Sequence, residues 1–188
     1  QPFLFSLSPN FLTPVSISSI ASFAYRKIGV RLALMDNVMN NIQELLSSNG
    51  IEYDIVSHEA VYTSEEASKV RGTTMDQGAK ALVMKADKQP ILVVIASHLR
   101  VDPRKFKSLY KIKDLRLISP AEVTDLTGLT VGSVPPFGNL MDLPTFVDQS
   151  LLLANHIAFN AGSHTTSIIM KCADFISLVQ PEIGVFAA

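Results

Sequence analysis

The stretch AKALVMKADKQPILVVIAS, residues 79–97, decides the fold. Its two apolar runs, residues 79–86 and 91–97, are separated by a short polar turn. Mostly apolar runs of this length are typical of strands that are buried on both faces, and so short a connection favours antiparallel neighbours. The stretch therefore predicts a β-hairpin in the middle of the core.

Signals for helices lie on both sides of this hairpin. Apolar residues recur at helical spacing over residues 38–46. Thr63 and Glu66 have the spacing of a capping box, in which two side chains satisfy backbone donors at the start of a helix, and Ser119 and Glu122 repeat it. Further helices are predicted over residues 102–110 and 172–179, and further strands over residues 51–58, 114–119, 146–152, 156–161 and 165–171.

The order of these elements favours one fold class. Strands outnumber helices, and several connections are too short for the crossovers of a doubly wound sheet. We therefore expect an α/β protein of the α+β kind, with a mixed or closed, barrel-like β-sheet flanked by helices. The length of 188 residues and the hydrophobic content of 47% fit one core, so we assign residues 36–188 to one domain and residues 1–35 to an N-terminal extension.

Composition excludes several classes of function. The net charge of −1 argues against a strongly basic nucleic-acid binder, and we expect no DNA partner. Cys172 is the single cysteine, so neither an internal disulfide nor a cysteine-rich zinc site can form, which favours a reducing compartment. The four histidines lack metal-ligand spacing, and we expect no metal and no other cofactor. No apolar run reaches the roughly 18 residues of a membrane span, so we expect no membrane partner.

Residues 1–35 differ from the rest of the chain. They contain three basic residues, no acidic residue and six serines. This composition is typical of an organellar transit segment, but a lineage-specific extension packed on the domain explains it as well. We expect a cytoplasmic location and keep an organellar one open.

Lys80 is unusual because it interrupts an apolar strand at its start. An ammonium group near a core needs a partner or a water-lined cleft. The functional interpretation is that Lys80 lies in such a cleft. The alternative is a lysine at a strand end whose charged tip reaches solvent. Lys85 lies five positions on, so it faces the opposite side of the strand and is expected to be solvated.

Two further stretches are candidates for binding. GLTVGSVPPFGNL, residues 128–140, combines three glycines with two adjacent prolines, which predicts a shaped loop after a short strand whose backbone groups are available for binding. Residues 100–116 contain seven basic and two acidic residues. Such a run is either a solvated face or a surface that binds phosphates.

Four motifs together resemble the YbaK/prolyl-tRNA synthetase editing-domain family, whose members hydrolyse amino acids mistakenly attached to tRNA. The resemblance covers residues 51–179. It rests on GAKALVMKA (residues 78–86), GSVPP (132–136), LPTFVDQSL (143–151) and FNAGSHTTSI (159–168). The family's fold, a barrel-like mixed sheet with surrounding helices, agrees with the order of elements predicted above.

The resemblance also implies a set of site residues. It makes Lys80 and Gly132 catalytic, with backbone N–H groups of the loop directed at the ester carbonyl. It assigns substrate binding to Ser133, Val134, Pro135, Pro136, Gly138, Asp148, Asn160, Gly162, Ser163 and His164. We add Arg100, Arg104, Lys105 and Lys107 as tRNA-binding candidates. Ala81 and His164 depart from residues that are frequent in the family, which leaves the substrate amino acid open.

The function implied is that of a free-standing aminoacyl-tRNA deacylase. Its expected substrate is mischarged tRNA, above all the tRNA for proline carrying alanine, serine or cysteine, and prolyl-tRNA synthetase is a candidate partner. Two alternatives stay open. The first is a tRNA-binding or synthetase-associated adaptor that has lost activity, and the second is a small-molecule hydrolase on the same scaffold.

Overall fold

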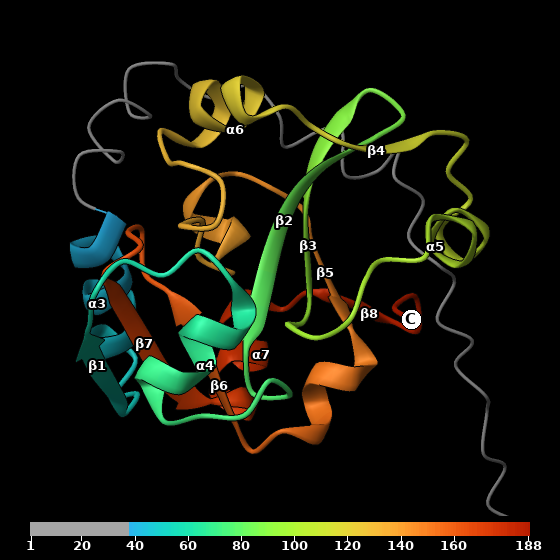
Figure 1. Cartoon of the computed structure of the whole chain (residues 1–188). Coiled ribbons are helices and arrows are strands. Elements are labelled where there is room, and N and C mark those ends of the chain that lie inside the picture. The colour runs from blue at the N-terminus through green and yellow to red at the C-terminus, as the bar shows by residue number, and fades with distance from the viewer. Residues whose placement is uncertain (1–37) are drawn as a thin grey trace, which may run out of the picture.

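The computed structural model describes residues 38–188, so the predicted N-terminal extension lies outside the described residues (Figure 1). The predicted hairpin is confirmed. Strand β2 (Ala79–Ala86) pairs antiparallel with β3 (Gln89–Ala96) along their whole length. Alternate residues of β3 enter different apolar clusters: Leu92 and Val94 pack on one face of the sheet and Val93 and Ile95 on the other. Burial on both faces explains the uninterrupted apolar run.

Three further strands complete this larger sheet, whose order is β4-β2-β3-β5-β8. Strand β4 (Leu115–Leu117) pairs antiparallel with β2. On the other side, β5 (Thr145–Asp148) runs parallel to β3, and β8 (Glu182–Gly184) runs parallel to β5. The sequence did not reveal β8, because three residues are too few to show a period.

A second, smaller sheet has the order β1-β7-β6 and is antiparallel throughout. Its strands are β1 (Tyr53–Ser57), β6 (His156–Asn160) and β7 (Thr166–Lys171). An isolated bridge between Gly78 and Ala158 joins the two sheets, with the Ala158 amide donating to the Gln77 carbonyl at 2.8 Å. The mixed α+β class is confirmed, but the sheets remain separate and form no closed barrel within the described residues.

Five helices surround the sheets in this part of the chain: α3 (Val38–Ser48), α4 (Ser64–Arg71), α5 (Pro103–Tyr110), α6 (Pro120–Thr127) and α7 (Cys172–Val179). Both predicted capping boxes are present, at Thr63 with Glu66 and at Ser119 with Glu122. In Figure 1, α4 lies in front of the smaller sheet, and α6 lies at the top of the view, to the left of the turn that joins β2 and β3. No helix between residues 38 and 188 has the length and apolar character needed to cross a bilayer.

Two details of the predicted chain path were wrong. The glycine-bearing loop follows helix α6, not a strand, and it contains the short 3-10 helix η2 (Gly138–Leu140). The strand predicted over residues 146–152 ends at Asp148. There the Asp148 carboxylate accepts from the Ser150 amide at 3.0 Å and starts the 3-10 helix η3 (Gln149–Leu153).

Asp148 also holds the C-terminal segment on the larger sheet. The residue is 3% exposed, and Oδ2 accepts from the amides of Phe186 and Ala187 at 2.7 and 2.8 Å. Burial alone raises the pKa of this carboxyl group, but the hydrogen bonds from Ser150, Phe186 and Ala187 outweigh it and lower the pKa below its usual value. The ionised form is therefore the one that the fold stabilises.

Replacing Asp148 with asparagine should destabilise the protein by about 3 kcal/mol. The charged acceptor is lost, and one of its two accepting oxygens is replaced by an amide group that can only donate. Urea unfolding measures this difference, with Asp125→Asn, an exposed site, as the matched control. Because the folded-state pKa is lowered, the contribution is present at neutral pH and is lost as the pH falls through that pKa. Equal stability of the two variants would contradict this role.

Candidate active site

A cleft of about 200 Å³ opens where the two sheets meet. Its walls come from helix α4 and the residues before it, the start of β2, the loop after α6, and the end of β6 with the turn that follows. The lining residues are 61–64, 67, 68, 71, 78–81, 97, 131, 132, 134, 160 and 164. Segments that are more than 100 residues apart in the sequence therefore form one site.

Lys80 lies at the start of β2 and forms part of one wall. Its ammonium group donates to the carbonyl oxygens of Ser97 at 3.1 Å and Leu99 at 2.6 Å. An ammonium has three N–H donors, so one remains for a ligand. Burial, and then the positive charge of Arg100, lower the pKa of Lys80 below its usual value.

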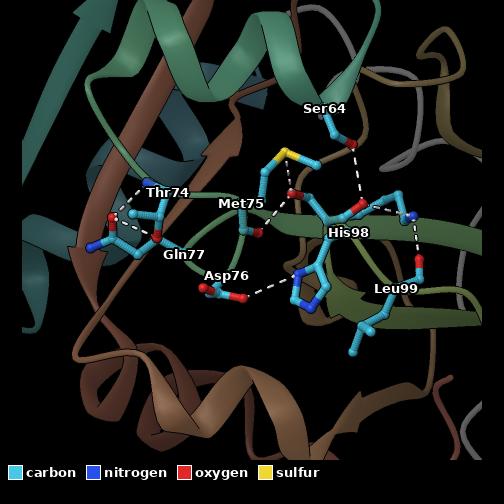
Figure 2. Close-up of polar contacts among 9 residues, drawn as sticks. Ser64, Thr74, Met75, Asp76, Gln77, His98 and Leu99 are labelled. Atoms are coloured by element: carbon cyan, nitrogen blue, oxygen red, sulfur yellow. Dashed lines mark hydrogen bonds and ion pairs between the residues drawn. The ribbon is translucent and has the colours of Figure 1, made fainter.

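The segment that holds Lys80 is itself braced, as Figure 2 shows for Ser64, Met75, Asp76 and His98. The Ser97 hydroxyl donates to the Met75 carbonyl at 2.8 Å, and the Ser64 hydroxyl donates to the Ser97 carbonyl at 3.3 Å. Asp76 Oδ1 lies 3.3 Å from His98 Nδ1. These contacts fix the carbonyls that position the Lys80 ammonium.

Gly132 lies on another wall of the cleft, at a φ of +90° that favours glycine. Its carbonyl accepts from Asn160 Nδ2 at 2.7 Å, and the next amide, of Ser133, donates to the Thr130 carbonyl at 3.1 Å. Within residues 38–188, the Gly132 N–H donates to no acceptor. It is therefore available to a ligand. The buried Pro135 and Pro136 stiffen the chain that follows.

His164 forms part of the wall beside Gly132, but both of its ring nitrogens are already engaged. Nδ1 lies 3.0 Å from the Val61 carbonyl and Nε2 lies 3.2 Å from the Thr130 hydroxyl. A carbonyl oxygen can only accept, so Nδ1 carries a proton and the neutral ring accepts at Nε2. Tyr62 packs on the ring with centroids 4.9 Å apart. This arrangement makes His164 a fixed wall and not a base for a cleft serine.

Arg71, in the last turn of α4, lines the cleft and was not identified from the sequence. Its guanidinium donates to Ser167 Oγ at 2.8 Å and to Oδ1 of Asn160. Burial lowers its pKa to about 10, so it remains charged at neutral pH. No local signal marks it, because its partners lie about 90 residues further along the chain.

The structure brings some of the predicted residues together and leaves others out. Lys80, Gly132, Val134, Asn160 and His164 line the cleft. The following predicted residues do not line it: Ser133, Pro135, Pro136, Gly138, Asp148, Gly162, Ser163, Arg100, Arg104, Lys105 and Lys107.

The residues outside the cleft have other contacts. Ser133 and Gly162 support the walls, since the Gly162 amide donates to the Ser133 carbonyl at 3.0 Å. Gly138 packs so tightly that a Cβ there would lie 2.0 Å from Thr145 Oγ1. Asp148 binds the C-terminal segment, as described above. The four basic residues lie on or before helix α5, and of these Arg100 acts on the site through its charge on Lys80.

The charged side chains that line the cleft are all positive. Lys80 and Arg71 contribute two cations to the lining, and no aspartate or glutamate of the described residues 38–188 belongs to it. The lining includes no thiol either, since Cys172 is buried elsewhere and burial raises its pKa. Such a cleft favours a polarised carbonyl or an anion, and it is suited to stabilising negative charge that develops on a bound ester.

Comparison with known proteins agrees with this geometry. The family model for the aminoacyl-tRNA editing domain matches residues 58–178. The match covers most of the chain and includes every residue that lines the cleft. The chain belongs to the aminoacyl-tRNA editing domain family.

Several relatives within this family are free-standing proteins of similar length. The multifunctional Ser/Thr-tRNA deacylase ProXp-y of Escherichia coli is 40% identical over 144 residues, which are 74% of this chain and 86% of that protein. The prolyl-tRNA editing protein ProX of Acetoanaerobium sticklandii is 25% identical over 73% of this chain and 88% of that protein. A crystal structure described as a candidate trans-editing enzyme for prolyl tRNA synthetase superposes with a TM-score of 0.71 at 25% identity, covering 80% of this chain and 97% of that one.

Proposed function

We propose that the chain is a free-standing aminoacyl-tRNA deacylase that hydrolyses the ester between a small amino acid and the terminal ribose of a mischarged tRNA. One observation carries this proposal: Lys80, Arg71 and Gly132 line the same cleft, and within residues 38–188 the Gly132 N–H has no acceptor and the lining has no carboxylate. The membership of the family and the names of two relatives point to the same reaction class.

The chemistry needs no protein nucleophile, because an aminoacyl ester is already activated. Water forms a new bond to the carbonyl carbon, the ester C–O bond breaks, and the ribose oxygen leaves with a proton. The Gly132 N–H donates to the carbonyl oxygen as negative charge develops there. The free N–H of Lys80 orients the ribose or the phosphate of the terminal nucleotide, and does not attack the ester.

The wall opposite the loop sets the preference for the amino acid. It includes Thr63, Ser64, Ser68 and Ser97, whose hydroxyl oxygens can still accept a hydrogen bond, and its volume suits a small side chain. Polar partners reject an apolar analogue more strongly than a size difference of one methylene can. We therefore expect serine and threonine to be removed best, as in the name of the Escherichia coli relative, with alanine and cysteine slower.

The tRNA body would contact Arg100 and the basic residues on helix α5. Arg100, Arg104 and Lys105 are exposed, and Lys107 lies on the same helix α5 as the last two. Contacts of this kind give affinity that falls as salt rises and do little to discriminate among sequences. The preference for the tRNA of proline would then depend on the acceptor stem and end nucleotides.

A deacylation panel tests the proposal. The purified chain is mixed with seryl-, threonyl-, alanyl- and cysteinyl-tRNA, each on its own tRNA and on the tRNA for proline, and ester loss is followed against an enzyme-free control. We expect seryl- and threonyl-tRNA to be hydrolysed fastest. If tRNA binds in a salt-sensitive way and no substrate loses its ester, the chain is instead a tRNA-binding adaptor. If only simple esters are cleaved, it is a small-molecule hydrolase.

A further inference from the structure

Arg71 forms no ion pair within residues 38–188, although its side chain is partly buried. Its guanidinium donates to three neutral acceptors: Ser167 Oγ at 2.8 Å, the Ala158 carbonyl at 3.4 Å and Oδ1 of Asn160. Removing a charge from water is costly unless hydrogen bonds or a counter-charge compensate for it. The three hydrogen bonds are therefore what compensates for the charge, and they hold the guanidinium in one position beside the cleft.

Asn160 transmits the effect of Arg71. Its Oδ1 accepts from Arg71 and lies 3.3 Å from the Ser167 hydroxyl, which also lies 2.7 Å from His58 Nε2. A side-chain amide has one accepting end and one donating end, so fixing Oδ1 on Arg71 points Nδ2 the other way. That Nδ2 donates to the Gly132 carbonyl at 2.7 Å.

The carbonyl held by Asn160 belongs to the peptide unit between Gly132 and Ser133. This unit is planar, and both of its polar groups are held. Asn160 binds its oxygen, and its N–H, that of Ser133, donates to the Thr130 carbonyl, so the orientation of the unit is set. The Gly132 N–H belongs to the preceding peptide unit, which is joined to this one through the φ and ψ rotations of Gly132, with φ at +90°. The loop geometry in the cleft therefore depends on the Asn160 amide.

We propose that Arg71 is a positioning residue for deacylation, which acts through Asn160 to hold the Gly132 loop where its N–H meets the ester. The inference rests on the proposed function, which it deepens. Arg71 ends helix α4, Asn160 ends β6 and Ser167 lies in β7. The hydrogen bonds from Arg71 through Asn160 to Gly132, here called the relay, therefore connect the helix, the smaller sheet and the loop.

Asn160→Asp is the decisive variant. It keeps the shape of the side chain and gives Arg71 a carboxylate partner, but it places an oxygen against the Gly132 carbonyl oxygen. We expect a melting temperature that is unchanged or higher, a kcat about 10- to 100-fold lower and a KM within about threefold of wild type, because a small displacement of catalytic groups costs about this much. Asn139→Asp, an exposed site with the same change in charge, is the matched control and should behave as wild type.

Arg71→Lys completes a double-mutant cycle with Asn160→Asp. If the two residues act through one path, the double variant should be no slower than the slower single variant. Rate losses that multiply, or an Asn160→Asp protein with the kcat of wild type, would overturn the proposal.

Amide hydrogen exchange gives a readout that does not depend on activity. The Ser133 amide should exchange faster in both single variants than in wild type, measured without substrate on the full chain. Unchanged exchange in both would also overturn the relay. If the wild-type protein deacylates no aminoacyl-tRNA, the proposed function fails, and the exchange experiment still decides whether Arg71 orders the loop.

Discussion

Replacing Lys80 with alanine should lower kcat/KM for seryl-tRNA by about 100- to 1000-fold, the size expected for removing a charged group that orients the substrate and stabilises developing charge. The cleft would lose one of its two cations, while the sheet would keep its pairing. Single-turnover deacylation by the purified variant measures the effect, and circular dichroism shows whether the fold is retained.

Lys85→Ala is the matched control for Lys80→Ala. Lys85 lies five residues further along the same strand and faces away from the cleft, with its ammonium 3.7 Å from Glu122. Its removal changes the net charge equally, so kcat/KM should stay within about twofold of wild type. Equal losses in the two variants would show that general charge, and not the place of Lys80, determines activity.

The lowered pKa of Lys80 adds a dependence on pH. If the ammonium is the active form, enzymatic turnover falls as the pH rises through that pKa, and the fall begins below the usual lysine value of about 10.5. Rates corrected for spontaneous ester hydrolysis give this profile. Because guanidinium stays protonated, a Lys80→Arg variant that retains activity should lack the alkaline fall.

Replacing Gly132 with alanine should lower kcat/KM by about 30- to 100-fold at a modest loss of stability. A side chain at a φ of +90° is strained, and the new Cβ would lie 3.0 Å from Cε1 of His164. The loop or the histidine must then move, and the Gly132 N–H moves with them. Deacylation kinetics and urea unfolding of the same preparation separate the two effects.

Gly50→Ala is the control for backbone strain. Gly50 has a φ of +66°, and an added Cβ would meet nothing within 4 Å. Both variants should lose about 1 to 2 kcal/mol of stability, because each places a Cβ in the left-handed region. Only Gly132→Ala should lose activity. Two variants with the same activity would mean that the loop does not act on the substrate.

The sequence predicted the elements well where one local pattern decided the structure. The hairpin of β2 and β3 follows from two apolar runs and a short turn, and helices α4 and α6 follow from their capping boxes. The sequence left open whether the mixed sheet closes into a barrel, because the way strands join into sheets depends on contacts such as the bridge between Gly78 and Ala158, which leave no local trace. The strand predicted over residues 146–152 was too long, because the Asp148 carboxylate ends β5 by capping a 3-10 helix there.

The site could be predicted in part. Lys80 was identified because a charge in an apolar strand is conspicuous, and Gly132 because its loop is rich in glycine and proline. Arg71 could not be identified, since an arginine at the end of a polar helix resembles any solvated residue until the fold brings Asn160 and Ser167 to it. Asp148 lies in a motif that resembles the family, but its carboxylate faces the C-terminal segment.

The most direct test of the account is a crystal structure of the chain with a seryl-adenosine analogue in which an amide replaces the hydrolysable ester. The account predicts that the analogue lies in the cleft, with its carbonyl oxygen within hydrogen-bond distance of the Gly132 N–H and its ribose beside the Lys80 ammonium. An analogue bound elsewhere, or one bound in the cleft with its carbonyl turned away from Gly132, would contradict it.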